Sequence, residues 1–398
     1  MRIDLLTREY PPEVYGGAGV HAAELSAALR RLADVRVRCF GEPRAEVGTR
    51  AYRPPPDLGA GNPALLFLAA DLGIAADCAG ADVVHSHTWY TNLAGHLAGL
   101  LHRTPHVMTM HSLEPLRPWK AEQLGSGYAL SSWMERAAAE EADAIVAVSR
   151  AMRADVLRVY PRIDPDRISV IHNGIDTDRY LPDTRTGALE LHGIDPGRPI
   201  VLFVGRVTRQ KGLQHFLRAA AALRPEAQLV LCCGQSDTPQ LAAEVDALVG
   251  ELSRARTGVV RIEGMLAQHE LRQLLTAAAV FVCPSLYEPM GIVNLEAMAC
   301  ETAVVASRVG GIPEVVEHGR TGLLVGFGQR DDGTGEPLDP AGFARDLAAA
   351  VNTLLDDPAL AVRFGRAGRE RAEKEFSWSA VAERTLRVYE RAASALSG

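Results

Sequence analysis

The stretch IVLFVGRVTRQKGL, residues 200–213, joins five consecutive apolar residues to a basic, glycine-containing turn. A short apolar run of this kind is typical of a strand that is buried on both faces. The residues after it, 213–223, have the spacing of an amphipathic helix. A strand, a turn and a helix in this order form the building block of a parallel sheet covered by helices, so the stretch predicts an α/β fold.

The same alternation continues on both sides of this stretch. A polar segment rich in proline and glycine, 182–197, separates two halves, which predicts two Rossmann-like, doubly wound parallel-sheet domains, residues 1–180 and 181–376. In the first half we expect strands at 3–6, 35–40, 83–85, 106–110, 144–148 and 168–171, helices at 17–33, 64–79 and 133–141, and a helix capped by Ser149. In the second half we expect further strands at 228–232, 259–262, 280–283 and 303–306, and helices at 239–252, 270–278, 291–299, 340–355, 358–375 and 378–396.

Composition and charge exclude several functional classes. The chain has 398 residues, 47% of them hydrophobic, which suffices for two cores. Its net charge is −7 without a basic arm, so nucleic-acid binding is not expected. The N-terminus lacks a long apolar segment, and the most apolar stretch, 64–81, contains Asp71 and Asp77, so we expect no signal peptide and no membrane insertion. Six cysteines without a Cys-x-x-Cys pair indicate buried thiols in a reduced compartment, and we expect a cytoplasmic protein.

A glycine-rich loop, VYGGAGVH at residues 14–21, follows the first expected strand and opens a helix. Gly16 and Gly17 would let the backbone approach a ligand closely, and a helix N-terminus offers amides and a partial positive charge to a phosphate. The loop lacks the Gly-x-Gly-x-x-Gly pattern of dinucleotide-binding proteins, so a plain tight turn is the alternative.

The basic turn after strand 200–204 is a more specific signal. Arg206 and Lys211 are five residues apart across it, a spacing that could place two cations over one dianion. Lys211 is one of only three lysines in a chain that otherwise uses arginine. The alternative is a solvated basic turn.

Two glutamates follow strand 280–283 in the segment PSLYEPMGIVNLE, residues 284–296. Glu288 lies in a turn where a carboxylate could bond sugar hydroxyls. Glu296 lies about one and a half turns into the helix expected from Gly291 and could reach a ribose. Ligands of α/β domains bind at the carboxyl ends of the strands, which is where both residues stand. A glycosidase would need the two carboxylates to flank one bond, and their different depths argue against that.

These motifs, together with EYPP at residues 9–12, resemble those of the retaining GT-B glycosyltransferases, among them the bacterial glycogen synthase-like enzymes. The resemblance covers nearly the whole chain. It implies two domains that face a central cleft with a nucleotide sugar, and a second domain that binds the nucleotide diphosphate. It also implies a last helix, about 377–398, that completes the first, acceptor-side domain.

The resemblance further implies roles for individual residues. Arg206 and Lys211 would neutralise the diphosphate leaving group, and His111 would face the transferred sugar near C1, although a structural histidine is the alternative there. The catalytic set is then His111, Arg206, Lys211 and Glu288. The donor-binding set is Gly16, Gly17, Arg206, Lys211, Met290, Gly291, Ile292 and Glu296, and Tyr15 and His87 are assigned to the acceptor side.

Three features differ from the glycogen synthases. Val14 replaces a lysine two residues before the Gly-Gly pair, Thr88 replaces an aspartate in a His-x-His-Asp-Trp motif, and the chain is short. In all three it resembles the actinobacterial relatives that make α-maltose 1-phosphate from ADP-glucose and glucose 1-phosphate. We therefore expect a retaining hexosyltransferase of glycogen and α-glucan biosynthesis with these small-molecule substrates. Elongation of an α-1,4-glucan and transfer to another acceptor are the alternatives.

The expected mechanism uses no metal and no cofactor. The two cations and the helix N-terminus at Gly291 would stabilise negative charge on the departing phosphate, and we expect a front-face reaction. Asp176-Thr177-Asp178 matches the Asp-x-Asp pattern of metal-dependent transferases, but it lies at the domain boundary. His85 and His87 could ligate a metal, but no third ligand is evident in the sequence.

Two other classes are weaker alternatives. A lipid-directed transferase would need a basic helix studded with large apolar residues, and helix 17–33 has no Trp or Phe. A non-catalytic nucleotide-sugar sensor would have no need for every cation and carboxylate described above. The sequence leaves open the nucleobase and the oligomeric state, a homo-oligomer included.

Overall fold

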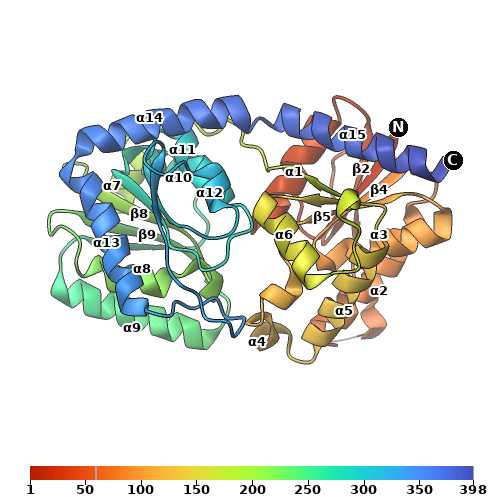
Figure 1. Ribbon diagram of the computed structural model, residues 1–398, viewed down its shortest axis with the longest axis horizontal. Coiled ribbons are helices and arrows are strands. Elements are labelled where there is room, and N and C mark those ends of the chain that lie inside the picture. Colours follow the sequence, from red (N-terminus) through yellow and green to blue (C-terminus); the bar gives the residue numbers. More distant parts are fainter. Residues whose placement is uncertain (59–60, 398) are drawn as a thin grey trace. The chain divides into compact units, whose positions relative to one another are not determined.

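The computed structural model describes residues 1–58 and 61–397, and the chain forms two compact units (Figure 1). Unit 1 consists of Met1–Gly174 and Trp378–Gly398, and unit 2 of Ile175–Ser377. The units thus divide at 174 and 377, whereas the sequence suggested 180 and 376. A Cβ on Gly174 would lie 2.6 Å from Cδ2 of Trp378, so glycine lets the backbone pass this indole.

Unit 1 contains a parallel sheet with the strand order β3-β2-β1-β4-β5-β6-β7. The order reverses direction beside β1, and such a switch point is where open α/β sheets bind ligands. The strands are β1 (Arg2–Thr7), β2 (Asp34–Phe40), β3 (Thr49–Tyr52), β4 (Val83–His87), β5 (His106–Met110), β6 (Ala144–Ala147) and β7 (Ile168–Val170). The helices are α1 (Gly17–Leu29), α2 (Pro63–Asp77), α3 (Trp89–His102), α4 (Lys120–Leu124), α5 (Gly127–Glu141), α6 (Arg150–Val159) and α15 (Trp378–Ser397).

Unit 2 repeats this plan with the order β10-β9-β8-β11-β12-β13. The predicted α/β class with two Rossmann-like parallel sheets is confirmed. The strands are β8 (Ile200–Val207), β9 (Gln228–Ser236), β10 (Val259–Glu263), β11 (Val280–Cys283), β12 (Val304–Ser307) and β13 (Gly322–Val325). The helices are α7 (Gly187–Leu191), α8 (Leu213–Ala220), α9 (Pro239–Ala255), α10 (Gln268–Ala277), α11 (Ile292–Ala299), α12 (Ile312–Val315), α13 (Pro340–Asp356) and α14 (Pro358–Glu375).

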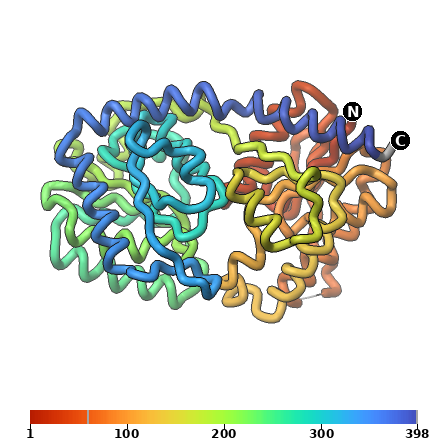
Figure 2. The backbone as a smooth tube through the Cα atoms, in the orientation of Figure 1, coloured from red at the N-terminus to blue at the C-terminus, as the bar shows by residue number. Residues whose placement is uncertain are grey.

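Apolar central strands hold each sheet between its helices. Val201, Leu202 and Phe203 of β8 are at most 2% exposed, as the continuous apolar run predicts. In unit 1, α15 contributes Trp378 and Tyr389 to the core that α1 and β1 also form. Figure 2 shows this C-terminal segment in blue beside the red N-terminal part of the chain.

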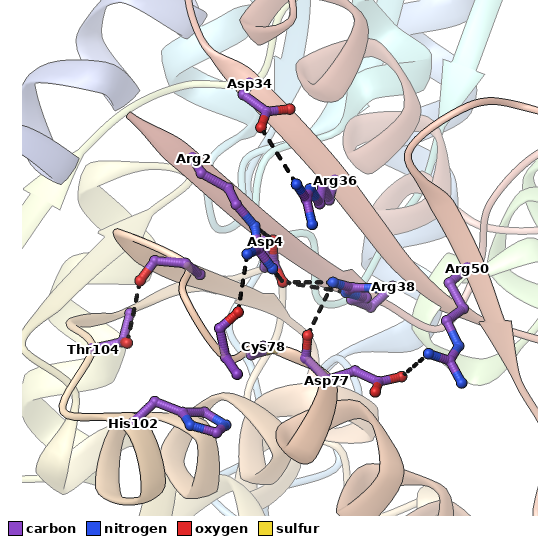
Figure 3. Close-up of polar contacts among 12 residues, drawn as sticks. Arg2, Asp4, Asp34, Arg36, Arg38, Arg50, Asp77, Cys78, His102 and Thr104 are labelled. Atoms are coloured by element: carbon purple, nitrogen blue, oxygen red, sulfur yellow. Dashed lines mark hydrogen bonds and ion pairs between the residues drawn. The ribbon is translucent and has the colours of Figure 1, made fainter.

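A cluster of ion pairs lies at the amino ends of the first strands of unit 1 (Figure 3). Asp4 is fully buried and pairs with Arg2 at 3.0 Å and with Arg38 at 2.9 Å. Arg50 pairs with Asp77 nearby. Because the charges neutralise one another at the edge opposite to the strand ends that bind ligands, we interpret this cluster as structural.

Six α-helices and strands of the described residues were not expected from the sequence: α3, the short helices α4, α7 and α12, and the strands β3 and β13. Helix α3 contains two glycines, which lower helix propensity and hide the pattern. Strands β3 and β13 have four residues each, and β3 is a polar edge strand with the sequence TRAY. Such short strands form because a neighbouring strand offers hydrogen bonds, and the local sequence carries little of that information.

The cysteines are buried and unpaired, as expected for small core residues. Burial raises the pKa of the Cys39 thiol to about 11 and that of Cys300 to about 12, so neither forms a thiolate near neutral pH. Within the described residues, no helix is both long and apolar enough to cross a membrane.

Candidate active site

The basic turn after β8 is shaped by two local features. The Thr208 hydroxyl accepts a hydrogen bond from the amide of Lys211 at 3.2 Å and caps a short 3-10 helix, Arg209–Lys211. Gly212 follows with a φ of 63°, and a Cβ there would lie 2.1 Å from the carbonyl oxygen of Pro284. Glycine at 212 therefore lets the turn pack directly against the loop after β11.

That packing joins Lys211 to Glu288. The Lys211 ammonium donates to Oε2 of Glu288 at 2.6 Å, and the Ser285 hydroxyl donates to the same oxygen at 3.1 Å. Burial acts to lower the pKa of Lys211, but the charge of Glu288, its hydrogen bond and the nearby Cys283 together outweigh burial, and the pKa is raised. Lys211 is therefore held in its charged form.

Glu288 lies in the loop after β11, where the sequence placed it. Its side chain is buried, because the turn folds back over the end of β11 and places the carboxylate beside Lys211. Within the described residues, its Oε1 forms no hydrogen bond, so this atom can still accept one from a sugar hydroxyl.

Arg206 lies near Lys211, as the spacing predicted. The positive charge of Arg206 acts to lower the pKa of Lys211, which indicates that the two cations are close. Arg206 also has a carboxylate partner, Asp237, with Nη1 3.2 Å from Oδ1. Each of the two cations predicted to bind phosphate thus forms an ion pair with an acidic side chain. The sequence had predicted neither ion pair.

The start of α11 lies beside this pair. Gly291 is the N-cap, not the first helical residue, and its φ of 93° favours glycine. A Cβ on Gly291 would lie 3.3 Å from Cγ of Glu288, so the helix N-terminus and the ion pair belong to one site. The amide of Ile292 therefore lies where an anion could bind. Met290 is 1% exposed, so its side chain belongs to the core and only its backbone can contact a donor.

Glu296 lies one turn further along α11 and accepts a hydrogen bond from the Tyr180 hydroxyl at 3.0 Å. Burial raises the pKa of Glu296 to about 7, although the hydrogen bond from Tyr180 and the charge of Arg179 oppose the rise. This carboxyl group is therefore partly protonated near neutral pH and can accept or donate a hydrogen bond to a ribose hydroxyl.

The glycine-rich loop of unit 1 differs from its predicted role. Oε2 of Glu9 accepts hydrogen bonds from the amides of Tyr15 at 2.9 Å and Gly16 at 2.7 Å. The Gly16 amide is thus occupied, and the Glu9 carboxylate binds the loop just before α1 without capping the helix itself. Of the two predicted glycines, Gly17 keeps a helix N-terminal amide that could face a donor.

Three histidines gather at the carboxyl ends of β4 and β5 and on the first turns of α1. Nδ1 of His87 lies 3.0 Å from Nε2 of His111, and the rings of His21 and His111 meet edge to face at 4.7 Å. Burial lowers the pKa of all three below the usual value, to about 4 for His21, and neighbouring imidazoles, His21 and His85 among them, lower the pKa of His87 and His111 further. The cluster is therefore uncharged near neutral pH.

The cluster brings together three nitrogens that could hold a metal ion, a set that the sequence did not reveal. One nitrogen from each of His21, His87 and His111 lies within 4.8 Å of the others. Oδ1 of Asn173 is 2.7 Å from Nδ1 of His21, so this nitrogen carries the proton and Nε2 presents a lone pair. Three neutral imidazoles in this arrangement can bind a transition metal. A hydrogen bond that orients one of them, as Asn173 orients His21, commonly supports such binding.

Two metal-binding alternatives have structural explanations. His85 does not belong to the cluster's ligand set, because Tyr389 and Thr109 occupy its two nitrogens at 2.6 and 2.7 Å. In the Asp-x-Asp triplet, Oδ1 of Asp176 accepts the amides of Asp178 and Arg179 at 3.0 and 2.9 Å. That side chain therefore forms a turn in the backbone.

Several site residues had no assigned role in the sequence analysis. His21, Asn173, Tyr180 and Asp237 come from four separate segments and contact predicted residues only in the folded chain. For His21 a signal existed, because it lies one helical turn after Gly17 and therefore on the same face of α1.

Comparisons with known proteins agree with this architecture. Residues 15–179 match the family Glycosyltransferase Family 4, and residues 198–357 match the family Glycosyl transferases group 1. The alpha-maltose-1-phosphate synthase of Mycolicibacterium smegmatis is 57% identical over 98% of this chain and 99% of its own length. The glycogen synthase of Mycobacterium tuberculosis is 33% identical over 98% of this chain and 94% of its own.

Among solved structures, sucrose-phosphate synthase from Thermosynechococcus elongatus superposes with a TM-score of 0.80 at 26% identity, covering 99% of both chains. Fold, family matches and full-length identity lead to one conclusion. The chain belongs to the retaining GT-B glycosyltransferases, in the group that contains the alpha-maltose-1-phosphate synthases and the glycogen synthases.

Proposed function

We propose that this chain transfers a glucosyl group from ADP-glucose to glucose 1-phosphate and forms α-maltose 1-phosphate and ADP. The observation that carries the proposal is the 57% identity, over 98% of the chain, to an enzyme named for this product. Elongation of a glucan is the second candidate, supported by the 33% identity to a glycogen synthase.

In this proposal Arg206, Lys211 and the amides at the start of α11 hold the diphosphate of the donor. Negative charge grows on the phosphate as the bond from the anomeric carbon to the phosphate oxygen breaks. Fixed cations stabilise this charge most in the transition state, which accelerates the reaction. Glu288 keeps Lys211 charged and in position, and we propose that the reaction uses neither a metal nor a cofactor.

The acceptor hydroxyl attacks the anomeric carbon on the face that the phosphate leaves. The new carbon–oxygen bond forms as the old one breaks, and the hydroxyl proton passes to an oxygen of the departing phosphate. Configuration is then retained without a covalent enzyme intermediate. His111 is uncharged, so it can position a sugar hydroxyl by hydrogen bonding without repelling the positive charge that develops on the sugar ring.

The test is to incubate the purified protein with ADP-glucose and chelator, with glucose 1-phosphate, with glycogen or with no acceptor. ADP release that requires glucose 1-phosphate, with a disaccharide phosphate as the product by mass, is the expected result. Release that requires glycogen would favour the second candidate. No release with either acceptor would contradict both assignments.

A further inference from the structure

Arg8 is a partly buried cation held among aromatic rings. It follows β1 directly, and its guanidinium carbon lies 5.1 Å from the ring centroid of Tyr15, 4.8 Å from that of Phe67 and 4.1 Å from that of Tyr90. Among the described residues, Arg8 forms no ion pair and no hydrogen bond. We call Arg8 and these three rings the Arg8 cage.

Other arginines of unit 1 that are similarly buried have carboxylate partners. Arg38 pairs with Asp4 at 2.9 Å, and Arg44 pairs with Glu13 at 3.1 Å. The nearest carboxylate along the chain from Arg8, Glu9, is engaged by the backbone amides of the glycine-rich loop. No acidic side chain in the described part of the chain therefore pairs with the charge of Arg8.

Aromatic faces can hold a guanidinium without using its N–H donors. The rings of the cage are themselves fixed, since Phe67 packs edge to face on Tyr90 at 4.8 Å and on Trp89 at 5.6 Å. Tyr15 is 44% exposed, so the cage has an open side. The aromatic rings thus hold the Arg8 guanidinium in position, and its five N–H donors remain available to a ligand that reaches the cage.

The cage lies at the ligand-binding edge of the sheet. Arg8 follows β1, Tyr90 follows β4, and His111 follows β5, and these strands are neighbours in that order. Adjacent strands are about 4.8 Å apart, so the ends of β1 and β5 are separated by about 10 Å. A hexose phosphate is of comparable length, and could place its phosphate at one end and a hydroxyl at the other.

A second arginine, Arg117, lies near the same ring. Burial raises the pKa of the Tyr90 hydroxyl; the charges of Arg8 and Arg117 act against that rise, and those of Glu114 and Glu9 add to it. Arg117 pairs with Glu114 at 3.5 Å, although its Nε is buried and forms no hydrogen bond within the described residues. Glu9 is held by the amides of the glycine-rich loop, so Arg8 is the cation near Tyr90 that has no carboxylate partner among the described residues.

We propose that Arg8 binds the phosphate group of the acceptor and selects a sugar phosphate over the uncharged end of a glucan. This inference rests on the proposed function and specifies how its acceptor is recognised. A guanidinium matches a phosphate with two parallel hydrogen bonds. A neutral acceptor would leave the cation unpaired as the site loses water, and such unpaired groups are a strong source of specificity.

The test compares Arg8→Gln with the wild type and with a control, Arg31→Gln, which removes an exposed arginine beyond the end of α1. We expect Arg8→Gln to raise KM for glucose 1-phosphate about 10- to 100-fold, the effect of losing charge-assisted hydrogen bonds. Affinity for ADP, measured by calorimetry, should change less than 2-fold. Arg8→Lys should restore part of the loss, because it keeps the charge without the paired donors.

The outcomes separate this inference from the proposed function. If the wild type uses glucose 1-phosphate and Arg8→Gln leaves its KM within 2-fold, the inference is wrong while the proposed function stands. If the wild type does not use glucose 1-phosphate, the proposed function fails. Calorimetric titration of glucose 1-phosphate, glucose 6-phosphate and inorganic phosphate into both proteins then decides the inference, and binding that is equal in the two proteins, or absent from both, overturns it.

Discussion

The two units share one strand order but carry different side chains at the carboxyl ends of their strands. In unit 2, Arg206 and Lys211 are paired with Asp237 and Glu288, so the charges are fixed before any ligand binds. In unit 1, the corresponding edge has uncharged histidines around His111. Unit 2 thus presents paired cations, whereas unit 1 presents neutral hydrogen-bonding groups around His111, with the Arg8 cage as a separate charged group on the same edge.

The difference follows from the ligands that each edge would bind. A diphosphate needs cations that stay protonated, and a buried carboxylate beside a lysine keeps its pKa high. Near an anomeric carbon that becomes positive, an imidazolium would be unfavourable, and packing several imidazoles together keeps them neutral. The following predictions test this contrast.

The largest expected effect is the loss of Lys211. Lys211→Met should lower kcat/KM for ADP-glucose about 10²- to 10³-fold, because a fixed positive charge at the leaving phosphate is lost. The variant also leaves Glu288 buried without its cation and should lower the melting temperature. Lys211→Met with Glu288→Gln should regain stability but not activity; recovery of both would show that Lys211 only balances Glu288.

The pKa of Glu296 predicts a pH dependence for unit 2. Its folded-state pKa of about 7 exceeds the usual 4.5, so the folded state keeps a proton that the unfolded state releases. This group therefore makes the free energy of unfolding fall as pH rises from about 4.5 to 7, by at most about 3 kcal/mol, with no further change above 7.

Glu296→Gln should remove this dependence, so the ligand-free variant should melt above the wild type at pH 8 and close to it at pH 4.5. Glu251→Gln, an exposed glutamate of α9, is the control. Parallel melting curves of wild type and Glu296→Gln across this range would contradict the prediction.

The neutral histidines of unit 1 predict sensitivity to zinc. Chelator should leave activity unchanged, whereas Zn²⁺ should inhibit by binding His21, His87 and His111. Asn173→Ala removes the amide that orients His21, and should raise the Zn²⁺ concentration for half inhibition about 10- to 100-fold. Equal inhibition of both proteins would place the zinc site elsewhere, and loss of wild-type activity in chelator would contradict the metal-free mechanism.

The smallest expected effect is at His111. His111→Ala should lower kcat about 10-fold, since it removes a neutral hydrogen bond rather than a charge. Because the imidazole does not titrate near neutral pH, the shape of the kcat profile between pH 6 and 8 should be the same in variant and wild type. If kcat of the wild type falls toward pH 6 and that of the variant does not, His111 acts as a titrating base. That result would contradict the contrast between the charged residues of unit 2 and the neutral histidines of unit 1.

The fold was largely readable because the signals are local. The apolar run at 200–204 and the turn at 205–212 specify a strand and a helix start within a few residues of each other. The elements that escaped, such as β3 and α3, depend on a neighbouring strand or on packing that offsets two glycines. The site was readable only in part: Arg206, Lys211 and Glu288 were named from spacing, but their ion pairs were not.

By itself, the sequence determined the α/β class, the two domains and the segments that carry charge at the strand ends, because each depends on the order of neighbouring residues. Only the tertiary structure decided that Glu9 occupies the Gly16 amide, that His21 joins His87 and His111, and that Arg8 has no anionic partner among the residues that the structure describes. Those facts concern side chains from distant segments or the desolvation of a charge. Burial and pairing are properties of the packed chain, so no local pattern encodes them.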